Sequence, residues 1–263
     1  MSVVIERIVT EKFEMKYFKF GSGNRTAVIL PGLSVKSVMD SADSVVSAYK
    51  PMHKDYTVFV FDRRSVCPEN YTISDMAEDT AEALMLLGLN NIYLFGVSQG
   101  GMMAQLIALN HSELVYKLAL CSTVARITED NSVILREWTA LAEQKDEEVL
   151  YKRMIESLFS AEFVDKFGKY IVQLMSGAGD EDLERFVILA KACDGFDVYS
   201  GEGKIKCPAL VIGSKADAVF EFKYIAEVAE KLGARMKVYD GYGHALYDET
   251  PECLNEILKF YNE

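Results

Sequence analysis

The sequence of 263 residues lacks an excess of positive charge. Its 28 Lys and Arg residues are outnumbered by 40 Asp and Glu residues, which gives a formal net charge of −12. A nucleic-acid-binding surface must be basic to neutralise phosphates, so this balance argues against a nucleic-acid partner. The sequence also has no apolar run approaching the roughly 18 residues of a membrane span. The sequence therefore predicts neither a nucleic-acid partner nor a membrane span, and it gives no information on oligomeric state.

Paired cysteines are lacking as well. The five cysteines are an odd number without a Cys-x-x-Cys pair, which argues against a disulfide framework and against a zinc site. We therefore expect no metal, no cofactor, and reduced, mostly buried thiols in a cytoplasmic protein. The first seven residues include Glu6 and Arg7, where a signal peptide would need an apolar stretch, and this also predicts a cytoplasmic location.

The most informative segment that is present is Gly-Val-Ser-Gln-Gly-Gly at residues 96–101. The apolar run 91–95 before it indicates a buried strand, and the run 102–109 after it indicates a helix. A turn from strand to helix within a few residues strains the backbone of Ser98, and larger side chains at the flanking glycines would collide with neighbouring backbone. This context is typical of a nucleophile elbow, which exposes the serine Oγ at a helix N-terminus. The alternative is a tight turn in another α/β protein, for example one that binds phosphate.

The order of elements predicts an α/β fold. Residues 3–20 alternate between apolar and polar types, which indicates an antiparallel pair of strands at a sheet edge. Apolar runs then alternate with helical segments, which predicts a mostly parallel sheet of roughly eight strands with helices on both faces. One helix is expected to begin with Ser74 as its N-cap and to end at Gly88. The expected parallel strands are 26–30, 56–61, 91–95, 117–121, 208–213 and 236–239, and further helices are expected over 220–232 and 250–261.

The strand–helix alternation stops between residues 126 and 202. This stretch has helix-spaced apolar positions and many charges, and nothing in it resembles a core strand. We interpret 126–202 as a helical cap inserted into an α/β core that comprises 1–125 and 203–263. Its apolar side chains are candidates for the walls of a substrate pocket, although aromatic residues at helical spacing more often form a cap's own core. The candidates are Trp138, Leu141 and Phe159, with Phe163, Phe167 and Met175 as further possibilities.

A nucleophilic serine needs a base, and the sequence has only three histidines. His53 precedes a strand and belongs at the N-terminal edge of the sheet. His111 ends the helix that starts after Ser98, where it caps that helix. His244 follows the last strand directly, and catalytic groups of parallel sheets gather at the carboxyl ends of strands. We therefore predict that His244 is the base.

The histidine in turn needs an acid that orients it. Asp217 follows the strand before the histidine strand, so its loop is expected to lie beside that of His244. Asp240 and Asp248 flank the histidine too closely in sequence to reach it from the side. The loop after residue 121 offers an alternative in Glu129 or Asp130. We favour Asp217, which gives the chain order Ser, Asp, His.

Attack on a carbonyl also requires donors for the oxyanion, each of which contributes roughly 2.7–4 kcal/mol to barrier lowering. One expected donor is the backbone N–H of Gln99, the residue after the nucleophile. The other is the N–H of Leu33, in the loop that follows strand 26–30. Pro31 has no N–H to offer, and Gly32 allows the backbone to pass close to the substrate. Taken alone, this Pro-Gly pair would be an ordinary turn at the end of a strand.

Together these segments resemble the α/β-hydrolase fold family, in particular its single-domain members with a helical cap. The resemblance rests on Leu30-Pro31-Gly32, Asp62-Arg63-Arg64, the elbow, the segment 213–217, and Gly243-His244 with Glu249 and Pro251 behind it. Members of the family usually have His-Gly where this sequence has Pro31-Gly32. Their Asp-x-Arg-Gly-x-Gly-x-Ser motif is degraded here at 62–67, and the proline that often follows the acid is replaced by Ala218.

The resemblance and the motifs predict a serine hydrolase, similar to a carboxylesterase, that forms an acyl-enzyme on Ser98. The substrate is expected to be an ester or related carbonyl compound with an apolar acyl part. A serine nucleophile excludes the dehalogenase and epoxide-hydrolase branches, which need an aspartate. Two alternatives stay open: a lyase, synthase or carbon–carbon bond hydrolase that uses the same three residues, and a non-catalytic member that binds a ligand or a protein under the cap.

Overall fold

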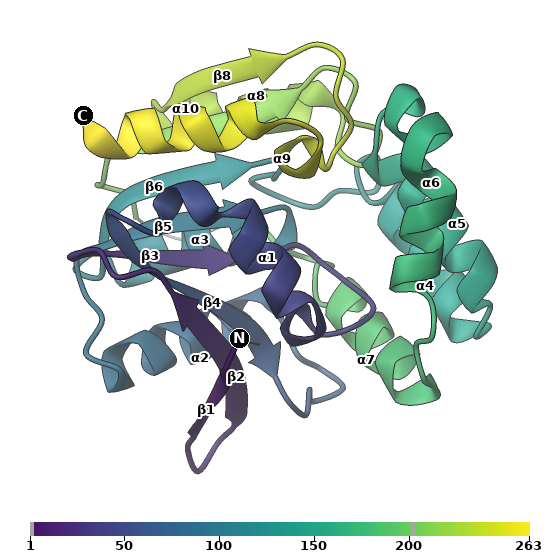
Figure 1. Cartoon of the computed structure of the whole chain (residues 1–263), viewed down its shortest axis with the longest axis horizontal. Coiled ribbons are helices and arrows are strands. Elements are labelled where there is room, and N and C mark those ends of the chain that lie inside the picture. The colour runs from purple at the N-terminus through teal and green to yellow at the C-terminus, as the bar shows by residue number, and fades with distance from the viewer. Residues whose placement is uncertain (1–2, 201–202) are drawn as a thin grey trace.

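The computed structural model describes residues 3–200 and 203–263, and its centre is one eight-stranded sheet. The strand order is β1-β2-β4-β3-β5-β6-β7-β8 (Figure 1). The strands are β1 (Ile5–Val9), β2 (Glu14–Phe20), β3 (Arg25–Leu30), β4 (Tyr56–Arg64), β5 (Ile92–Val97), β6 (Val115–Cys121), β7 (Ala209–Ser214) and β8 (Arg235–Tyr239). The helices are α1 (Ala42–Ala48), α2 (Ile73–Leu86), α3 (Gln99–Asn110), α4 (Val133–Glu143), α5 (Glu147–Leu158), α6 (Ala161–Met175), α7 (Asp180–Lys191), α8 (Phe222–Leu232), α9 (Leu246–Glu249) and α10 (Pro251–Asn262), with short 3₁₀ turns at Val38–Ser41 and Lys50–Met52.

The predicted strands and their directions are confirmed. β1 and β2 form an antiparallel pair at one edge, and β2 continues antiparallel to β4. The remaining strands run parallel, from β4 through β3, β5, β6 and β7 to β8. Because the strands are parallel, the loops that follow β3, β5, β6, β7 and β8 all leave the sheet at the same edge. Within the described residues, no helix is long and apolar enough to cross a membrane.

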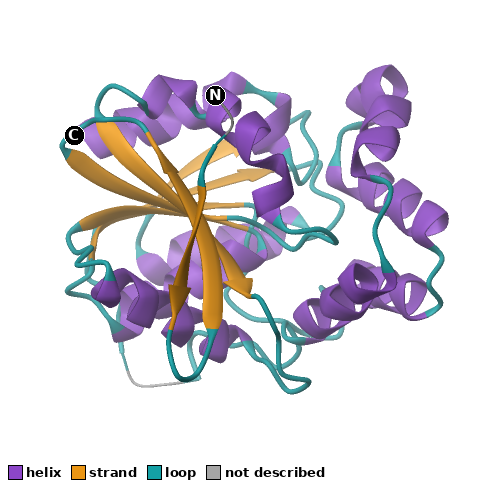
Figure 2. Ribbon diagram, turned by 60° about the horizontal axis from the view of Figure 1, so that its bottom comes forward, coloured by secondary structure: helices purple, strands orange, loops and turns teal. Residues whose placement is uncertain are grey.

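Both faces of the sheet are covered by helices, which Figure 2 shows on the two sides of the strands. Alternate residues of a strand point to opposite faces, and each face has its own apolar cluster. Phe18, Val60 and Ile212 belong to the cluster that includes residues of α1 and α10. Val28 and Leu94 belong to the other cluster, with residues of α2, α3 and α8. Apolar side chains on both faces explain why the parallel strands are continuous apolar runs in the sequence.

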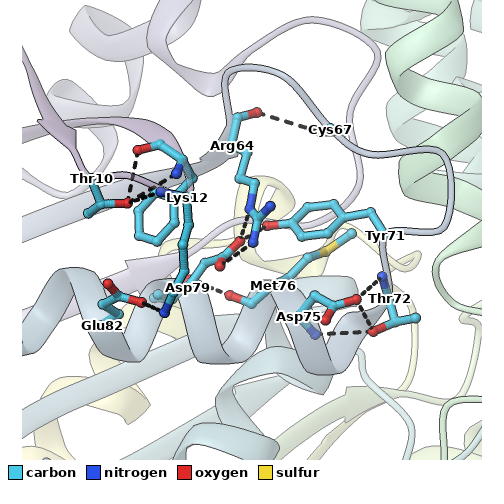
Figure 3. Close-up of polar contacts among 12 residues, drawn as sticks. Thr10, Lys12, Arg64, Cys67, Tyr71, Thr72, Asp75, Met76, Asp79 and Glu82 are labelled. Carbon is cyan, nitrogen blue, oxygen red and sulfur yellow. Dashed lines mark hydrogen bonds and ion pairs between the residues drawn. The ribbon is translucent and has the colours of Figure 1, made fainter.

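The start of α2 differs from the prediction. The N-cap is Thr72 rather than Ser74, because Thr72 Oγ1 accepts the N–H of Asp75 while the Asp75 side chain accepts the N–H of Thr72. The same helix is attached to the end of β4, where the Arg64 guanidinium binds the Asp79 carboxylate through both oxygens (Figure 3). The hydroxyl of Tyr71 donates to that carboxylate at 2.6 Å. β4 itself ends at Arg64, three residues beyond the predicted end, where Arg64 pairs with Met15 of β2.

The segment from α4 to α7, here called the four-helix segment, lies between β6 and β7 in the chain. In Figure 1 it stands beside the sheet, at the edge where the parallel strands end. An isolated antiparallel bridge joins Arg126 to Asp197 near its two ends. Inside the segment α4 packs against α5 and α7, and α5 packs against α6. Helices fill this stretch, as the sequence pattern predicts.

Candidate active site

Ser98 occupies the turn between β5 and α3 in a conformation that few residues adopt. Its φ is 50° and its ψ is −118°, although it is not a glycine. The neighbouring glycines leave no room for side chains, because a Cβ on Gly96 would lie 2.6 Å from the Gly100 carbonyl oxygen. A Cβ on Gly100 would lie 2.1 Å from the Leu30 carbonyl oxygen. The strained backbone is therefore imposed by close packing of the turn against β3 and α3.

His244 and Asp217 form a hydrogen-bonded pair in the loops after β8 and β7. His244 Nδ1 lies 2.8 Å from Asp217 Oδ2 and 3.0 Å from Oδ1. The carboxylate is itself fixed, since Asp217 Oδ1 accepts the backbone N–H groups of Val219 and Phe220 at 2.9 and 2.8 Å. Both side chains are buried, with exposed fractions of 2% and 0%. This arrangement holds the imidazole in one orientation and leaves Nε2 as the ring nitrogen that can act on another group.

The end of β6 holds the serine turn and the histidine loop next to each other. The Ser98 N–H donates to the Cys121 carbonyl at 3.0 Å, and Thr123 Oγ1 donates to the Ser98 carbonyl at 2.7 Å. Between these two residues, Ser122 Oγ donates to the His244 carbonyl at 2.6 Å. Among the hydrogen bonds of the described residues, none joins Ser98 Oγ to His244 Nε2. Three consecutive residues therefore fix the backbones of both the predicted nucleophile and the predicted base.

The other candidate bases and acids have different surroundings. His53 Nε2 lies 3.2 Å from the Val46 carbonyl oxygen, before β4, and His111 is the C-cap of α3, where its Nε2 lies 2.9 Å from Glu78 Oε2. The alternative acids Glu129 and Asp130 are both exposed. Of the three histidines, His244 is the one paired with Asp217, and residues 121–123 hold its backbone next to that of Ser98.

The backbone N–H groups of Leu33 and Gln99, the two predicted oxyanion donors, have no acceptor among the described residues, and neither do those of their neighbours Gly32 and Gly100. Gln99 is the first residue of α3, so its N–H has no partner within the helix. Leu33 follows Gly32, and a Cβ on Gly32 would lie 3.4 Å from Ser98 Cβ. The loop after β3 therefore passes directly over the serine. Free donors on both sides of a serine can bind an oxygen that carries negative charge.

Arg63, for which the sequence pattern predicts no role, connects the two segments that carry these donors. Its Nη2 donates to the Pro31 carbonyl at 2.7 Å and to Gln99 Oε1 at 2.8 Å. The side chain is almost fully buried, and burial lowers the pKa of the guanidinium, while the charge of Asp62 acts in the opposite direction. One buried cation thus fixes the loop after β3 relative to the first residue of α3.

Several polar contacts attach the four-helix segment to this site. Gln99 Nε2 donates to the Leu189 carbonyl of α7 at 2.6 Å. Arg185, also on α7, forms an ion pair of 2.9 Å with Asp62 at the end of β4. Glu249 accepts the N–H of Gly243 at 2.7 Å, and it also accepts the N–H of Ser160, the N-cap of α6, at 3.1 Å. The loop that carries His244 and the start of α6 therefore share one carboxylate.

A cavity of about 370 Å³ is lined by the loop after β3, which carries Leu33, whereas Ser98, Gln99 and His244 are not among its lining residues. Its walls come from the loop after β3, from α1 and α9, and from the four-helix segment through Tyr151, Leu174 and Met175. Trp138 is buried within the larger apolar cluster, and Leu141 packs against that cluster. Phe159 stacks on Phe163 with ring centroids 4.8 Å apart. Of the six apolar residues that the sequence suggested as pocket walls, only Met175 lines this cavity.

The described residues contain no group of three or more His, Cys, Asp or Glu side chains that could hold a metal ion. The site therefore consists of a strained serine, a buried histidine–carboxylate pair, two free backbone donors and an adjacent cavity. Its side chains come from the loops after β3, β5, β7 and β8, which meet at one edge of the sheet. This combination suits nucleophilic attack on a carbonyl group.

Comparison with known proteins places this arrangement in a family. A family model described as alpha/beta hydrolase fold matches residues 28–251. A protein of Rhizobium rhizogenes named "Putative carbamate hydrolase RutD" is 24% identical over 216 residues, which cover 78% of this chain and 82% of that protein. The human serine hydrolase BPHL is 20% identical, with 98% of this chain and 86% of the relative covered.

Solved structures show the same fold over nearly the whole chain. The α/β hydrolase enzyme MGS-M2, from a Medee basin deep-sea metagenome library, has a TM-score of 0.85 at 22% identity, with 98% of both chains covered. An enol-lactonase from Burkholderia xenovorans has a TM-score of 0.79 at 20% identity, with 97% of this chain and all of that chain covered. The family model spans well over half of the chain, and this protein therefore belongs to the α/β-hydrolase-fold family.

Proposed function

We propose that the protein is a serine hydrolase that cleaves an ester or a related carbonyl substrate through an acyl-enzyme on Ser98. The observation that carries this proposal is the position of Ser98, strained at a helix N-terminus between the free N–H groups of Leu33 and Gln99. The buried pair of His244 and Asp217 supports it, because a serine hydroxyl is a poor nucleophile without a base. Relatives named as a carbamate hydrolase and an enol-lactonase act on carbonyl substrates of this kind.

In the proposed mechanism His244 takes the proton of Ser98 as the serine oxygen attacks the substrate carbonyl carbon. The resulting oxyanion is bound by the N–H groups of Leu33 and Gln99, and Asp217 stabilises the imidazolium. The bond to the leaving group then breaks, and the leaving group receives the proton from His244. Water, activated by the same histidine, attacks the acyl-enzyme and releases the acid, which regenerates the free serine.

We further propose that residues 126–202 act as a cap over this site, with the core formed by 1–125 and 203–263. Support comes from the position of the four-helix segment at the edge of the sheet where the functional loops meet (Figure 1). Support also comes from Tyr151, Leu174 and Met175, which this segment contributes to the cavity wall. An apolar acyl group would bury its surface against these side chains. Trp138, Leu141 and Phe159 would then act on the substrate indirectly, through the packing of the cap.

A fluorophosphonate probe tests the proposed nucleophile directly. It is expected to label the wild-type protein and to miss Ser98→Ala and His244→Ala, while Ser65→Ala, at an exposed serine, is the control and is expected to be labelled like the wild type. Labelling of Ser98→Ala at the wild-type rate, or no labelling of the wild type, would overturn the proposal. A panel of p-nitrophenyl esters with increasing acyl length then measures the substrate range. Normal labelling without turnover of any ester would instead favour a lyase, synthase or carbon–carbon bond hydrolase.

A further inference from the structure

The loop that carries His244 is held to the sheet through its carbonyl groups. Ser122, after β6, donates its hydroxyl proton to the His244 carbonyl at 2.6 Å. Ser214, the last residue of β7, donates its hydroxyl proton to the carbonyl of Tyr242. Two alternate carbonyl groups of the loop are therefore fixed to neighbouring strands, and the N–H groups on either side of the histidine are left for other partners.

The residues on either side of the predicted base contact the four-helix segment. After it, the N–H of Ala245 donates to the carbonyl of Leu158, the last residue of α5, at 2.7 Å. Before it, Gly243 packs so closely that a Cβ there would lie 2.5 Å from the same carbonyl oxygen and 2.7 Å from Phe159 Cα. Residues 158–160, here called the α5–α6 junction, therefore contact the chain directly before and directly after the base.

Glu249 joins the histidine loop to this junction. Its Oε1 accepts the N–H of Gly243 at 2.7 Å and the N–H of Ser160 at 3.1 Å, and its Oε2 accepts the Ser160 hydroxyl. Ser160 in turn caps α6, because its Oγ accepts the N–H of Phe163 at 3.3 Å. In the part of the chain that the structure describes, Glu249 forms no ion pair, so N–H and O–H donors alone hold its carboxylate. Hydrogen bonds to a carboxylate are roughly twice as strong as neutral ones, which makes this a firm connection.

We propose that Glu249 is a positioning residue that fixes the backbone of His244 against the α5–α6 junction. This inference rests on the proposed hydrolase function, in which His244 is the base. Asp217 fixes the rotation of the imidazole ring, whereas Glu249 fixes the backbone from which that side chain extends. The carboxylate acts through the N–H of Gly243 and touches neither the substrate nor the reacting atoms. The effect on the reaction is large, because a misplacement of about 1 Å can lower a rate by about 10²-fold.

Two variants of Glu249 separate its position from its charge. Glu249→Ala removes all three contacts, and we expect kcat per active site to fall about tenfold or more while KM changes little. Glu249→Gln is expected to restore kcat, because one amide oxygen can accept both N–H groups and the amide N–H can donate to the Ser160 hydroxyl. Steady-state kinetics on a short-chain p-nitrophenyl ester measure both, with active sites counted by complete fluorophosphonate labelling. A Gln variant as impaired as the Ala variant would show that the charge matters, and would overturn the positioning role.

Glu147→Ala is the matched control. Glu147 Oε1 also accepts two backbone N–H groups, those of Gly177 and Ala178 at 2.6 and 2.8 Å, but these follow the opposite end of α6 from Ser160. The same kind of contact is thus lost within the four-helix segment, and kcat is expected to stay at the wild-type value. An equal fall of kcat in Glu147→Ala would show that any loosening of this segment lowers activity, which would overturn a specific role of Glu249.

An NMR experiment separates this proposal from the hydrolase proposal. In Ser98→Ala with isotope-labelled histidine, the Nδ1 proton of His244, buried in its hydrogen bond to Asp217, is expected to give a resolved downfield signal that is absent from His244→Ala. Adding Glu249→Ala should broaden or remove the signal, and adding Glu249→Gln or Glu147→Ala should keep it. This pattern supports the positioning role even if no ester is hydrolysed. An unchanged signal with Glu249→Ala, or a wild-type kcat in that variant, overturns the role and leaves the hydrolase proposal standing.

Discussion

The loops around Ser98 and helix α6 of the four-helix segment are built in opposite ways. Around the serine and His244, the Asp217 carboxylate and the hydroxyls of Ser122 and Thr123 each have a defined hydrogen-bond partner. On α6 only Gly168 is buried, and large apolar side chains such as Tyr170 and Leu174 are more than 60% exposed. The contrast indicates that the proposed chemistry depends on fixed geometry, while packing constrains the exposed face of α6 much less.

The largest loss of activity is expected when the hydrogen-bonded pair of Asp217 and His244 is disrupted. Asp217→Asn keeps the shape of the site but presents an amide to His244 Nδ1, which favours the wrong tautomer of the imidazole. We expect kcat to fall by about 10³–10⁴-fold, as in other Ser-His-Asp sites. Steady-state kinetics on a short-chain p-nitrophenyl ester measure this loss. Asp130→Asn is the matched control, because it makes the same chemical change at the alternative, exposed acid.

These two outcomes separate the candidate acids. If Asp130→Asn lost as much activity as Asp217→Asn, the pairing of His244 with Asp217 would not explain catalysis. Activity within tenfold of wild type in Asp217→Asn would lead to the same conclusion.

A smaller loss is expected when the connection between the two oxyanion donors is removed. Arg63→Met breaks the bonds to the Pro31 carbonyl and to Gln99 Oε1. We expect kcat to fall by about 10²-fold with KM nearly unchanged, the size of effect that loss of one oxyanion donor produces. Arg63→Lys is expected to recover part of kcat, because an ammonium group can still reach one of the two oxygens.

A fall in kcat with little change in KM would identify Arg63 as a residue that positions the oxyanion donors. A purely structural role would lower the amount of folded enzyme and leave kcat per active site, counted with the fluorophosphonate probe, unchanged. Arg235→Met, which breaks a surface ion pair with Glu263, is the control for the loss of an arginine.

The comparison also explains which features the sequence can predict. The parallel strands were predictable because burial on both faces requires continuous apolar runs, and Ser98 was predictable because its turn requires glycines. Asp217 and His244 directly follow predicted parallel strands, so the sequence alone predicts the edge of the sheet at which they lie. Fixed local geometry leaves local signals in the sequence, and these features have such signals.

Features that depend on long-range contacts lack such signals. The partners of Arg63 lie 32 and 36 residues away in the chain, so its role is not visible in its neighbours. Thr72 caps α2 instead of Ser74, because both residue types are good caps and a shift of two residues is decided by the surrounding structure. Asp248 is too close in sequence to pair with His244, but the same closeness brings it to the cavity.

We expect the stability of the protein to depend on pH through Asp248, which lines the same cavity as Leu174 and Met175 of α6. Burial raises the pKa of this carboxyl from 3.8 to about 7, so between these values the folded protein binds more protons than the unfolded chain. The free energy of unfolding therefore falls as pH rises from about 4 to about 7. Because Asp248 is exposed to the cavity, we expect a contribution on the order of 1 kcal/mol after screening.

Asp248→Asn removes this contribution without changing the shape of the side chain. Thermal unfolding at pH 5 and pH 8 is expected to show the variant gaining stability relative to wild type at the higher pH. The difference between Asp130→Asn and wild type should be equal at both values. If the difference in melting temperature between Asp248→Asn and wild type were the same at both pH values, the Asp248 carboxylate would be as well solvated as one on an open surface.

The smallest effect is expected on the exposed face of α6. Tyr170 is 66% exposed, so Tyr170→Ser should change the free energy of unfolding by no more than about 0.5 kcal/mol. Phe186 on α7 is fully buried in the same segment, and Phe186→Ala should cost about 3–5 kcal/mol because it leaves a cavity. Urea unfolding of both variants measures the contrast. A cost above about 1.5 kcal/mol for Tyr170→Ser would show that α6 is packed as tightly as the core. The contrast between α6 and the loops around Ser98 would then be wrong.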